Sequence, residues 1–87
     1  MKVCIPTPLR SYTGNEKWVE SEGATVNDVL ADLDSKFPGI RFRVVDEHGR
    51  LRQHMRIFVN QEAIRDLTTP VTDAHEVTIM QALSGGS

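Results

Sequence analysis

An apolar stripe with helical spacing in residues 25–37 constrains the fold of this chain more than any other feature. The stripe repeats at every third or fourth position, as one face of a helix does: Val26, Val29, Leu30, Leu33 and Phe37. Thr25 is a good N-cap, and the charge of Asp28 favours the positive end of the helix dipole. Pro38 and Gly39 end the segment, because proline cannot continue the hydrogen-bond ladder. The sequence therefore predicts one amphipathic helix that must pack on an apolar surface.

A sheet is the predicted partner of this helix, because the remaining apolar residues alternate as in half-buried strands. The expected strands are 2–6, 16–20, 56–59, 63–65 and 76–81. With one helix over one face, we predict a two-layer α+β fold with a mixed sheet of four to five strands. The first and last strands are expected to pair in parallel at its centre. The predicted core contains the residues that face the helix or the sheet: Val3, Ile5, Val26, Val29, Leu30, Leu33, Ile57, Val59, Val77 and Ile79.

The segments between these elements carry weaker signals. Residues 11–15 are expected to form a turn that closes a hairpin between the first two strands. Residues 40–45 fit either a short strand or an irregular crossing, and 67–71 suggest a short helical turn. We therefore expect one domain over residues 1–82, followed by a glycine-rich tail over 83–87.

Length and charge argue against several classes of protein. Eighty-seven residues give a single core with little room for a deep cleft, which favours a carrier or binding module over an enzyme. The net charge is −2, and the densest basic stretch, 41–56, is interrupted by Asp46 and Glu47, so we expect no nucleic-acid partner. No apolar run approaches the roughly 20 residues that cross a bilayer, which predicts no membrane association. The single cysteine excludes an internal disulfide and fits the cytoplasm.

The residues that often carry chemistry are interpreted as structural. Cys4 lies inside a strand, where a small, partly buried apolar side chain is the better interpretation than a sulfur-handling thiol. His48, His54 and His75 lack the spacing of metal ligands, so we expect solvated histidines and no metal site.

An apolar group is expected on the sheet face opposite the helix. If Ile57 and Ile79 face the helix, then Phe58 and Met80 face away from it. Nothing else in the chain can cover that face, so Phe58 and Met80 are predicted to bind a partner, with ordinary cross-strand packing as the alternative. Trp18 joins this group if the second strand has the matching register.

The order of these elements, together with the ending Leu83-Ser84-Gly85-Gly86, resembles the ThiS/MoaD family of ubiquitin-like sulfur carriers, and within it the cysteine-biosynthesis type. Four stretches carry the resemblance in order and cover nearly the whole chain: IPTPLR, GATVNDVLADLDSKFPGI, RIFVNQEAIR and DAHEVTIMQALSGG. The resemblance implies a ubiquitin-like β-grasp fold, with one main helix across one face of the sheet. It also implies a carrier rather than an enzyme.

The resemblance further implies a reaction at the C-terminus. An E1-like adenylating enzyme would use ATP to activate the carboxylate of Gly86, and a sulfur donor would convert it into a thiocarboxylate. Gly85 would be its flexible neighbour, and Leu83 and Ser84 are expected to contact the partner. A sulfur-acceptor synthase would then use the sulfur to make cysteine or a related metabolite. The carrier itself would bind no cofactor and no metal.

Ser87 departs from the family pattern, whose mature members end at the second glycine. Because an amide at Gly86 cannot be adenylated, Ser87 would first have to be removed, as a zinc metalloprotease does for some precursors of this type. Two alternatives stay open: Ser87 is a cloning remnant, or Gly-Gly-Ser is only a flexible end. A rival function is a ubiquitin-like modifier conjugated to lysines through Gly86, and a third is a β-grasp interaction module with a dispensable tail.

Overall fold

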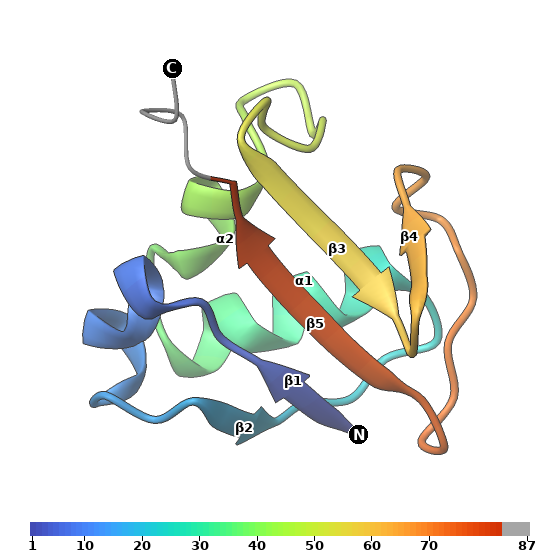
Figure 1. Cartoon of the computed structure of the whole chain (residues 1–87), viewed down its shortest axis with the longest axis horizontal. Coiled ribbons are helices and arrows are strands. Elements are labelled where there is room, and N and C mark those ends of the chain that lie inside the picture. Colours follow the sequence, from blue (N-terminus) through green and yellow to red (C-terminus); the bar gives the residue numbers. More distant parts are fainter. Residues whose placement is uncertain (83–87) are drawn as a thin grey trace.

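The computed structural model describes residues 1–82, so the predicted tail at 83–87 lies outside the described residues. The elements in chain order are β1 (Lys2–Cys4), a 3-10 helix η1 (Thr7–Thr13), β2 (Trp18–Glu20), α1 (Val26–Lys36), α2 (Ile40–Val44), β3 (Met55–Val59), β4 (Glu62–Ile64) and β5 (Glu76–Gln81). Figure 1 shows α1 lying across one face of the sheet. The predicted α+β architecture with one main helix is confirmed.

β5 is the central strand of the sheet. The strand order is β2-β1-β5-β3-β4, in which β1 and β5 are parallel and all other neighbours are antiparallel. The predicted parallel pairing of the first and last strands is therefore confirmed. Val3 pairs with Val77, and Ile57 pairs with Ile79, so these predicted core residues share one face.

α1 begins and ends where the sequence predicts. The Asp28 amide donates a hydrogen bond to the Thr25 hydroxyl at 3.2 Å, which caps the first turn. The helix ends at Lys36, before Pro38, and Gly39 has a φ of 97°, a left-handed conformation that favours glycine. Within the described part of the chain, no helix is both long enough and apolar enough to cross a membrane.

The core lies between α1 and the sheet. All ten predicted core residues are buried, with exposed fractions of 9% or less. Seven more apolar residues complete it: Leu9, Ile40, Val44, Val45, Met55, Leu67 and Val71. Most of these come from connecting segments, which alternate too little for a strand pattern to mark them.

Residues 40–45 differ from the prediction, because they contain helix α2 rather than a strand or an irregular crossing. The Asp34 carboxylate accepts hydrogen bonds from the amides of Gly39 and Arg41, both at 3.1 Å, at the start of this helix. Ile40 and Val44 lie one helical turn apart and are both buried. A carboxylate at the end of α1 thus fixes the conformation of the next segment.

The connection between β1 and β2 also differs from the prediction. The two strands pair antiparallel as expected, but η1 (Thr7–Thr13) lies between them instead of a simple turn. Leu9 of η1 is buried in the core, and Gly14 then reverses the chain with a φ of 63°. Residues 67–71 form a turn without a helical residue, so the predicted short helical turn is wrong.

Candidate functional site

The residues with predicted reactive roles lie outside the described part of the chain. The described residues end at Ala82, and the residues with predicted roles in the reaction or in partner binding come after it: Leu83, Ser84, Gly85, Gly86 and Ser87. Their roles stay predictions. The structure does establish their point of departure, because β5 ends at Gln81 and the Ala82 amide donates a hydrogen bond to the His54 carbonyl at 2.7 Å. The chain is therefore held to the sheet up to residue 82.

One row of side chains crosses the whole sheet on the face opposite α1. The register pairs the residues in the order Trp18, Cys4, Thr78, Phe58 and Ala63, from β2 to β4. Each alternates along its strand with residues of the helix-facing side. We call this surface the open face. Trp18 belongs to it, which settles the register that the sequence left undecided.

The open face carries apolar side chains that water reaches. Met80 lies next to the row, two residues along β5 from Thr78, and is 49% exposed. Trp18 is 42% exposed, whereas Phe58 and Cys4 are half-buried. The predicted placement of Phe58 and Met80 away from the helix is confirmed, and so is the partly buried state of Cys4. The binding of a partner to them stays a prediction.

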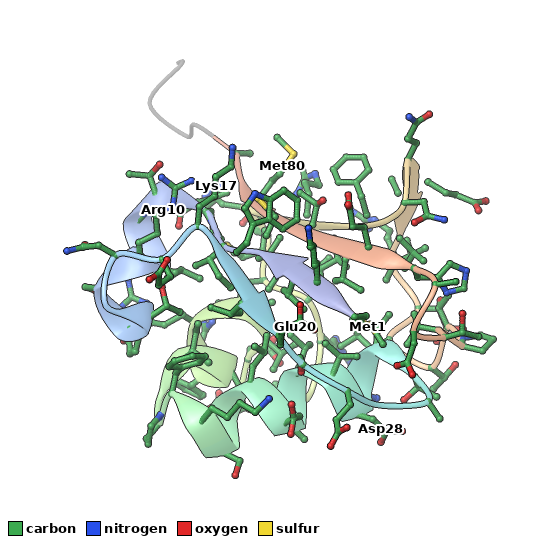
Figure 2. The ribbon with its side chains drawn as sticks, turned by 90° about the horizontal axis from the view of Figure 1, so that it is seen from below. Met1, Arg10, Lys17, Glu20, Asp28 and Met80 are labelled. Atoms are coloured by element: carbon green, nitrogen blue, oxygen red, sulfur yellow. The ribbon has the colours of Figure 1, made fainter. Side chains whose placement is uncertain are left out.

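Charged residues lie at both ends of the open face. Where β5 begins, Glu20 and Glu76 lie on either side of Lys2, their partner on β1. Where β5 ends, Arg56 is the cross-strand partner of Met80, and Figure 2 shows Met80 on the side of the sheet away from α1. A partner that approaches the end of β5 therefore meets a cation beside an apolar side chain, an arrangement that suits an acidic rim on the partner.

Ionisable groups with shifted pKa values have local structural causes. A hydrogen bond from the Ser21 hydroxyl at 2.8 Å, with Lys36 at 3.0 Å, lowers the pKa of Asp32 and ties the end of β2 to α1. His75 accepts a hydrogen bond from the Thr72 amide at 2.9 Å and belongs to a turn. Across residues 1–82, no three His, Cys, Asp or Glu side chains gather as metal ligands.

An exposed aromatic residue beside the end of β5 was not found from the sequence. Phe42 of α2 is 57% exposed, more than Trp18 or Met80. The Arg52 guanidinium lies over its ring, 4.6 Å from the centroid, in a cation–π contact. Both side chains line a groove of about 490 Å³ that also contains Gln81. The available signal was an aromatic residue flanked by two arginines, a pattern atypical of a core position.

Comparison with known proteins decides the family. The model of the ThiS family matches residues 3–86, which is nearly the whole chain and includes the two glycines before Ser87. The chain belongs to the ThiS family. The β-grasp fold expected for this family is confirmed by the structural neighbours described next.

Three relatives place the chain within the ThiS family. The sulfur carrier protein CysO of Mycobacterium tuberculosis is 39% identical over 89 aligned residues, which cover 97% of this chain and 96% of that protein. A chain in the crystal structure of the Amycolatopsis orientalis BexX/CysO complex is 41% identical, with a TM-score of 0.91 and 98% coverage of both chains. SAMP1 from Haloferax volcanii, a small archaeal modifier protein, is 28% identical, with a TM-score of 0.79 and coverage of 99% and 98%.

Proposed function

We propose that this ThiS-family chain is a sulfur carrier whose Gly86 is adenylated and converted into a thiocarboxylate. The observation that carries the proposal is the family match through residue 86, together with the 39% identity to a sulfur carrier protein over nearly the full length of both chains. The thiocarboxylate would donate its sulfur to the synthesis of cysteine or a related metabolite. The chain acts as a carrier and not as an enzyme, because the chemistry is performed on its terminus by its partners.

The proposed reaction has two balanced steps. A carboxylate oxygen of Gly86 attacks the α-phosphate of ATP, which releases pyrophosphate and forms an acyl-adenylate. A sulfur nucleophile then attacks the Gly86 carbonyl carbon and displaces AMP. Gly85 and Gly86 suit this chemistry because a backbone without Cβ atoms fits into a narrow channel and can closely approach the atoms that line it.

The fold supports this role by holding the chain up to residue 82. β5 is bonded to a strand on each side, and the chain is anchored through the Ala82 amide to His54. The four residues from Leu83 to Gly86 can extend roughly 14 Å at about 3.4 Å per residue. That reach is sufficient to bring Gly86 into a recessed active site while the open face rests on the surface of the partner.

Several partners follow from this proposal. An E1-like adenylating enzyme supplies the ATP site, so the carrier needs no cofactor of its own. A sulfur-acceptor synthase receives the sulfur, and the crystallised BexX/CysO complex supports the binding of such a chain to a second protein. A zinc metalloprotease that removes Ser87 would release the Gly86 carboxylate.

The test compares chains that end at Gly86 and at Ser87. Each is incubated with a ThiS-family activating enzyme, ATP and sulfide, and its intact mass is measured. We expect a gain of about 16 Da, the replacement of oxygen by sulfur, only for the shorter chain. The control is Gly86→Ala in the shorter chain, which keeps a terminal carboxylate but adds a Cβ and should react more slowly. Efficient thiocarboxylation of the 87-residue chain would contradict the proposal.

A second candidate function is a ubiquitin-like modifier joined to lysines through Gly86. The similarity to an archaeal modifier protein favours this function. That protein is 28% identical to the chain, however, whereas the CysO proteins are 39–41% identical, so the carrier is the first proposal. The same mass experiment separates the two when lysate proteins are added. High-mass conjugates that contain the chain would support the modifier, and a free thiocarboxylate would support the carrier.

A further inference from the structure

Positive charge is concentrated in one part of this chain. Six of the seven arginines lie in residues 41–65, against only three carboxylates in the same segment. The four ion pairs formed within residues 1–82 involve the N-terminus, Lys36 and His48, and none involves an arginine. These guanidinium groups therefore keep their full charge available to a ligand.

Two of the arginines are positioned by neutral acceptors. Arg56 Nη1 donates to the carbonyls of Gln53 and Met55, at 2.8 and 2.9 Å. Arg52 Nε donates to the Phe42 carbonyl at 2.7 Å while the guanidinium covers the Phe42 ring. Carbonyl groups fix the orientation of a guanidinium without cancelling its charge, which prepares it for an anionic partner.

Two carboxylates close to the arginines, Asp46 within the basic segment and Asp66 just after it, accept hydrogen bonds from other groups. Asp46 accepts hydrogen bonds from the His48 and Arg50 amides, at 2.8 and 3.0 Å, and these bonds lower its pKa, so it serves the turn after α2. Asp66 accepts bonds from the Thr68 amide and hydroxyl, at 2.9 and 2.6 Å. Neither carboxylate pairs with an arginine in the described structure.

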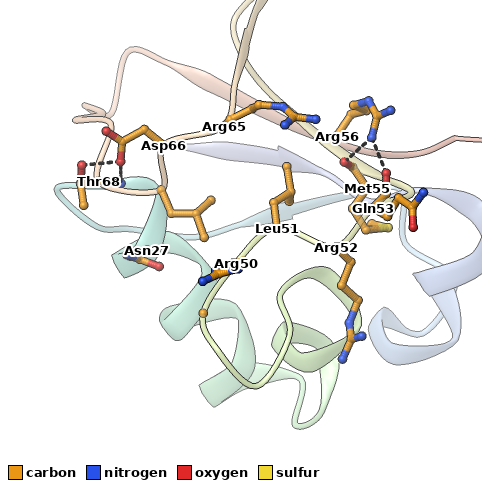
Figure 3. Close-up of a pocket in the computed structure, with 12 residues that line it drawn as sticks. Asn27, Arg50, Leu51, Arg52, Gln53, Met55, Arg56, Arg65, Asp66 and Thr68 are labelled. Carbon is orange, nitrogen blue, oxygen red and sulfur yellow. Dashed lines mark hydrogen bonds between the residues drawn. The ribbon is translucent and has the colours of Figure 1, made fainter.

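The arginines line two adjoining grooves. The larger, of about 630 Å³, is bordered by Arg50, Arg52, Arg56 and Arg65, with Leu51 on its floor. Figure 3 shows Arg56 and Arg65 along one side and Arg50 and Arg52 along the other. The smaller groove, of about 490 Å³, shares three of the same lining residues and adds Arg43, Phe42 and Gln81. We call both together the arginine groove.

We propose that the arginine groove binds an acidic segment of a partner protein, with glutamates or aspartates set between apolar residues. The arginines of the larger groove lie along two opposite sides of it (Figure 3), whereas a phosphate site gathers its donors around one point. Leu51 and the exposed Phe42 offer apolar contacts that a peptide can use and a bare anion cannot. Asp66 at the border of the groove and the net charge of −2 oppose a nucleic acid.

This surface adjoins the open face at Arg56 and is independent of the tail chemistry proposed above. Gln81 lines the groove, and it is the last residue of β5. A partner segment in the groove would therefore lie beside the point where the tail starts. The inference goes beyond sulfur carriage, because the groove could hold an acidic partner whether Gly86 carries sulfur or forms conjugates.

The test is an NMR titration of the 87-residue chain with a synthetic octapeptide that alternates glutamate, leucine and aspartate. We expect saturable shifts at the amides of residues 42–43, 49–56 and 65–68. Binding should weaken as salt rises, because the pairs of guanidinium and carboxylate groups are exposed to solvent. A peptide with glutamine and asparagine in place of the acids should not bind. Inorganic pyrophosphate and a single-stranded oligothymidine are titrated in parallel.

Variants assign the binding to the groove. Arg50→Glu with Arg65→Glu should weaken peptide binding by about tenfold, which corresponds to about 1.4 kcal/mol. Both side chains are exposed and form no side-chain hydrogen bond within the described residues, so melting curves should change little. The matched control combines Arg41→Glu on α2 with Lys2→Glu on β1, which changes the charge equally outside the groove and should alter affinity by less than about twofold.

Three outcomes would overturn the proposal. The peptide could shift the amides of the open face instead of the groove. The matched control could weaken binding as much as the groove variant, which would indicate a nonspecific charge effect. Pyrophosphate or the oligonucleotide could bind more tightly than the peptide, which would assign the groove to phosphate. The Gly86 mass experiment can succeed or fail regardless of any of these results.

Discussion

The open face is expected to bind the activating enzyme through Met80 and Phe58, and truncation of these side chains tests this directly. Met80 is 49% exposed and Phe58 is half-buried, whereas their strand neighbours Ile57 and Ile79 are buried against α1. Met80→Ala and Phe58→Ala therefore remove apolar surface from the side of the sheet that carries no helix. The core on the other side is left intact.

The exposed fraction of Met80 sets the size of the effect. Burial of a whole Met side chain contributes about 1.5–3 kcal/mol, and half of this side chain is already buried in the free chain. About 1 kcal/mol is then left for binding, so Met80→Ala should weaken the complex about fivefold. Phe58→Ala should cost about 1–3 kcal/mol of affinity if the partner encloses the ring. Loss of the buried half of Met80 should also cost about 1 kcal/mol of stability, which lowers the melting temperature by about 4–8 °C, so Met80→Ala should reduce both affinity and stability.

Calorimetric titration of the activating enzyme measures affinity, and thermal unfolding of each variant measures stability. Ser35→Ala is the matched control, because Ser35 is exposed on α1 in the opposite layer and should change neither quantity. Unchanged affinity for Phe58→Ala, combined with a clearly lowered melting temperature, would refute the reasoning. It would show that Phe58 stabilises the sheet and that the partner binds elsewhere.

Three further predictions concern stability. Leu33→Ala should cost about 2–5 kcal/mol in urea unfolding, because Leu33 is fully buried, and a loss below about 1 kcal/mol would show that α1 does not pack on the sheet. Gly23→Ala should lower the melting temperature, because the new Cβ would lie 2.6 Å from the Asp28 Cβ and 2.9 Å from the Asp28 backbone carbon; an unchanged melting curve would contradict this. The lowered pKa of Asp32, caused first by the Ser21 hydroxyl, stabilises the fold above the ordinary value of 3.8, and this contribution is lost as pH falls through the lowered pKa. Unfolding of Asp32→Asn should accordingly depend less on pH between about 5 and 2 than unfolding of the parent chain, and equal pH dependence would contradict the assignment.

Elements with their own periodicity were predictable from the sequence. The stripe in 25–37 lies on a helix, and the alternation in 76–81 lies on a strand, because each repeats often enough to identify its geometry. The same alternation assigned Phe58 and Met80 to the open face, since neighbouring residues of a strand point to opposite sides. These predictions required no knowledge of distant contacts.

The connecting segments could not be predicted, because contacts from elsewhere in the chain decide their conformation. α2 is five residues long, which is too short for a helical period to be recognised. Its start depends on the Asp34 carboxylate and on the left-handed Gly39, both outside the helix. A sequence pattern records which residues are apolar, but it does not record which carboxylate accepts which amide.

The arginine groove illustrates the same limit at a candidate binding site. Along the sequence, Asp46 and Glu47 interrupt the basic stretch and suggest that its charge is diluted. In the fold, the Asp46 carboxylate is turned into its own loop. Arg65 is brought from beyond β4 to the same groove as Arg50. Linear spacing therefore underestimates the local positive charge.

The last two residues of β5 connect the two candidate binding surfaces. Met80 points to the open face, and Gln81, the next residue, lines the arginine groove. Because successive side chains of a strand point to opposite sides, one partner that contacts both surfaces would hold this strand end from two directions. The Ala82 amide, bonded to the His54 carbonyl, extends this fixed point by one residue. Contact on both surfaces would therefore fix the position of the strand end from which the chain continues towards Gly86.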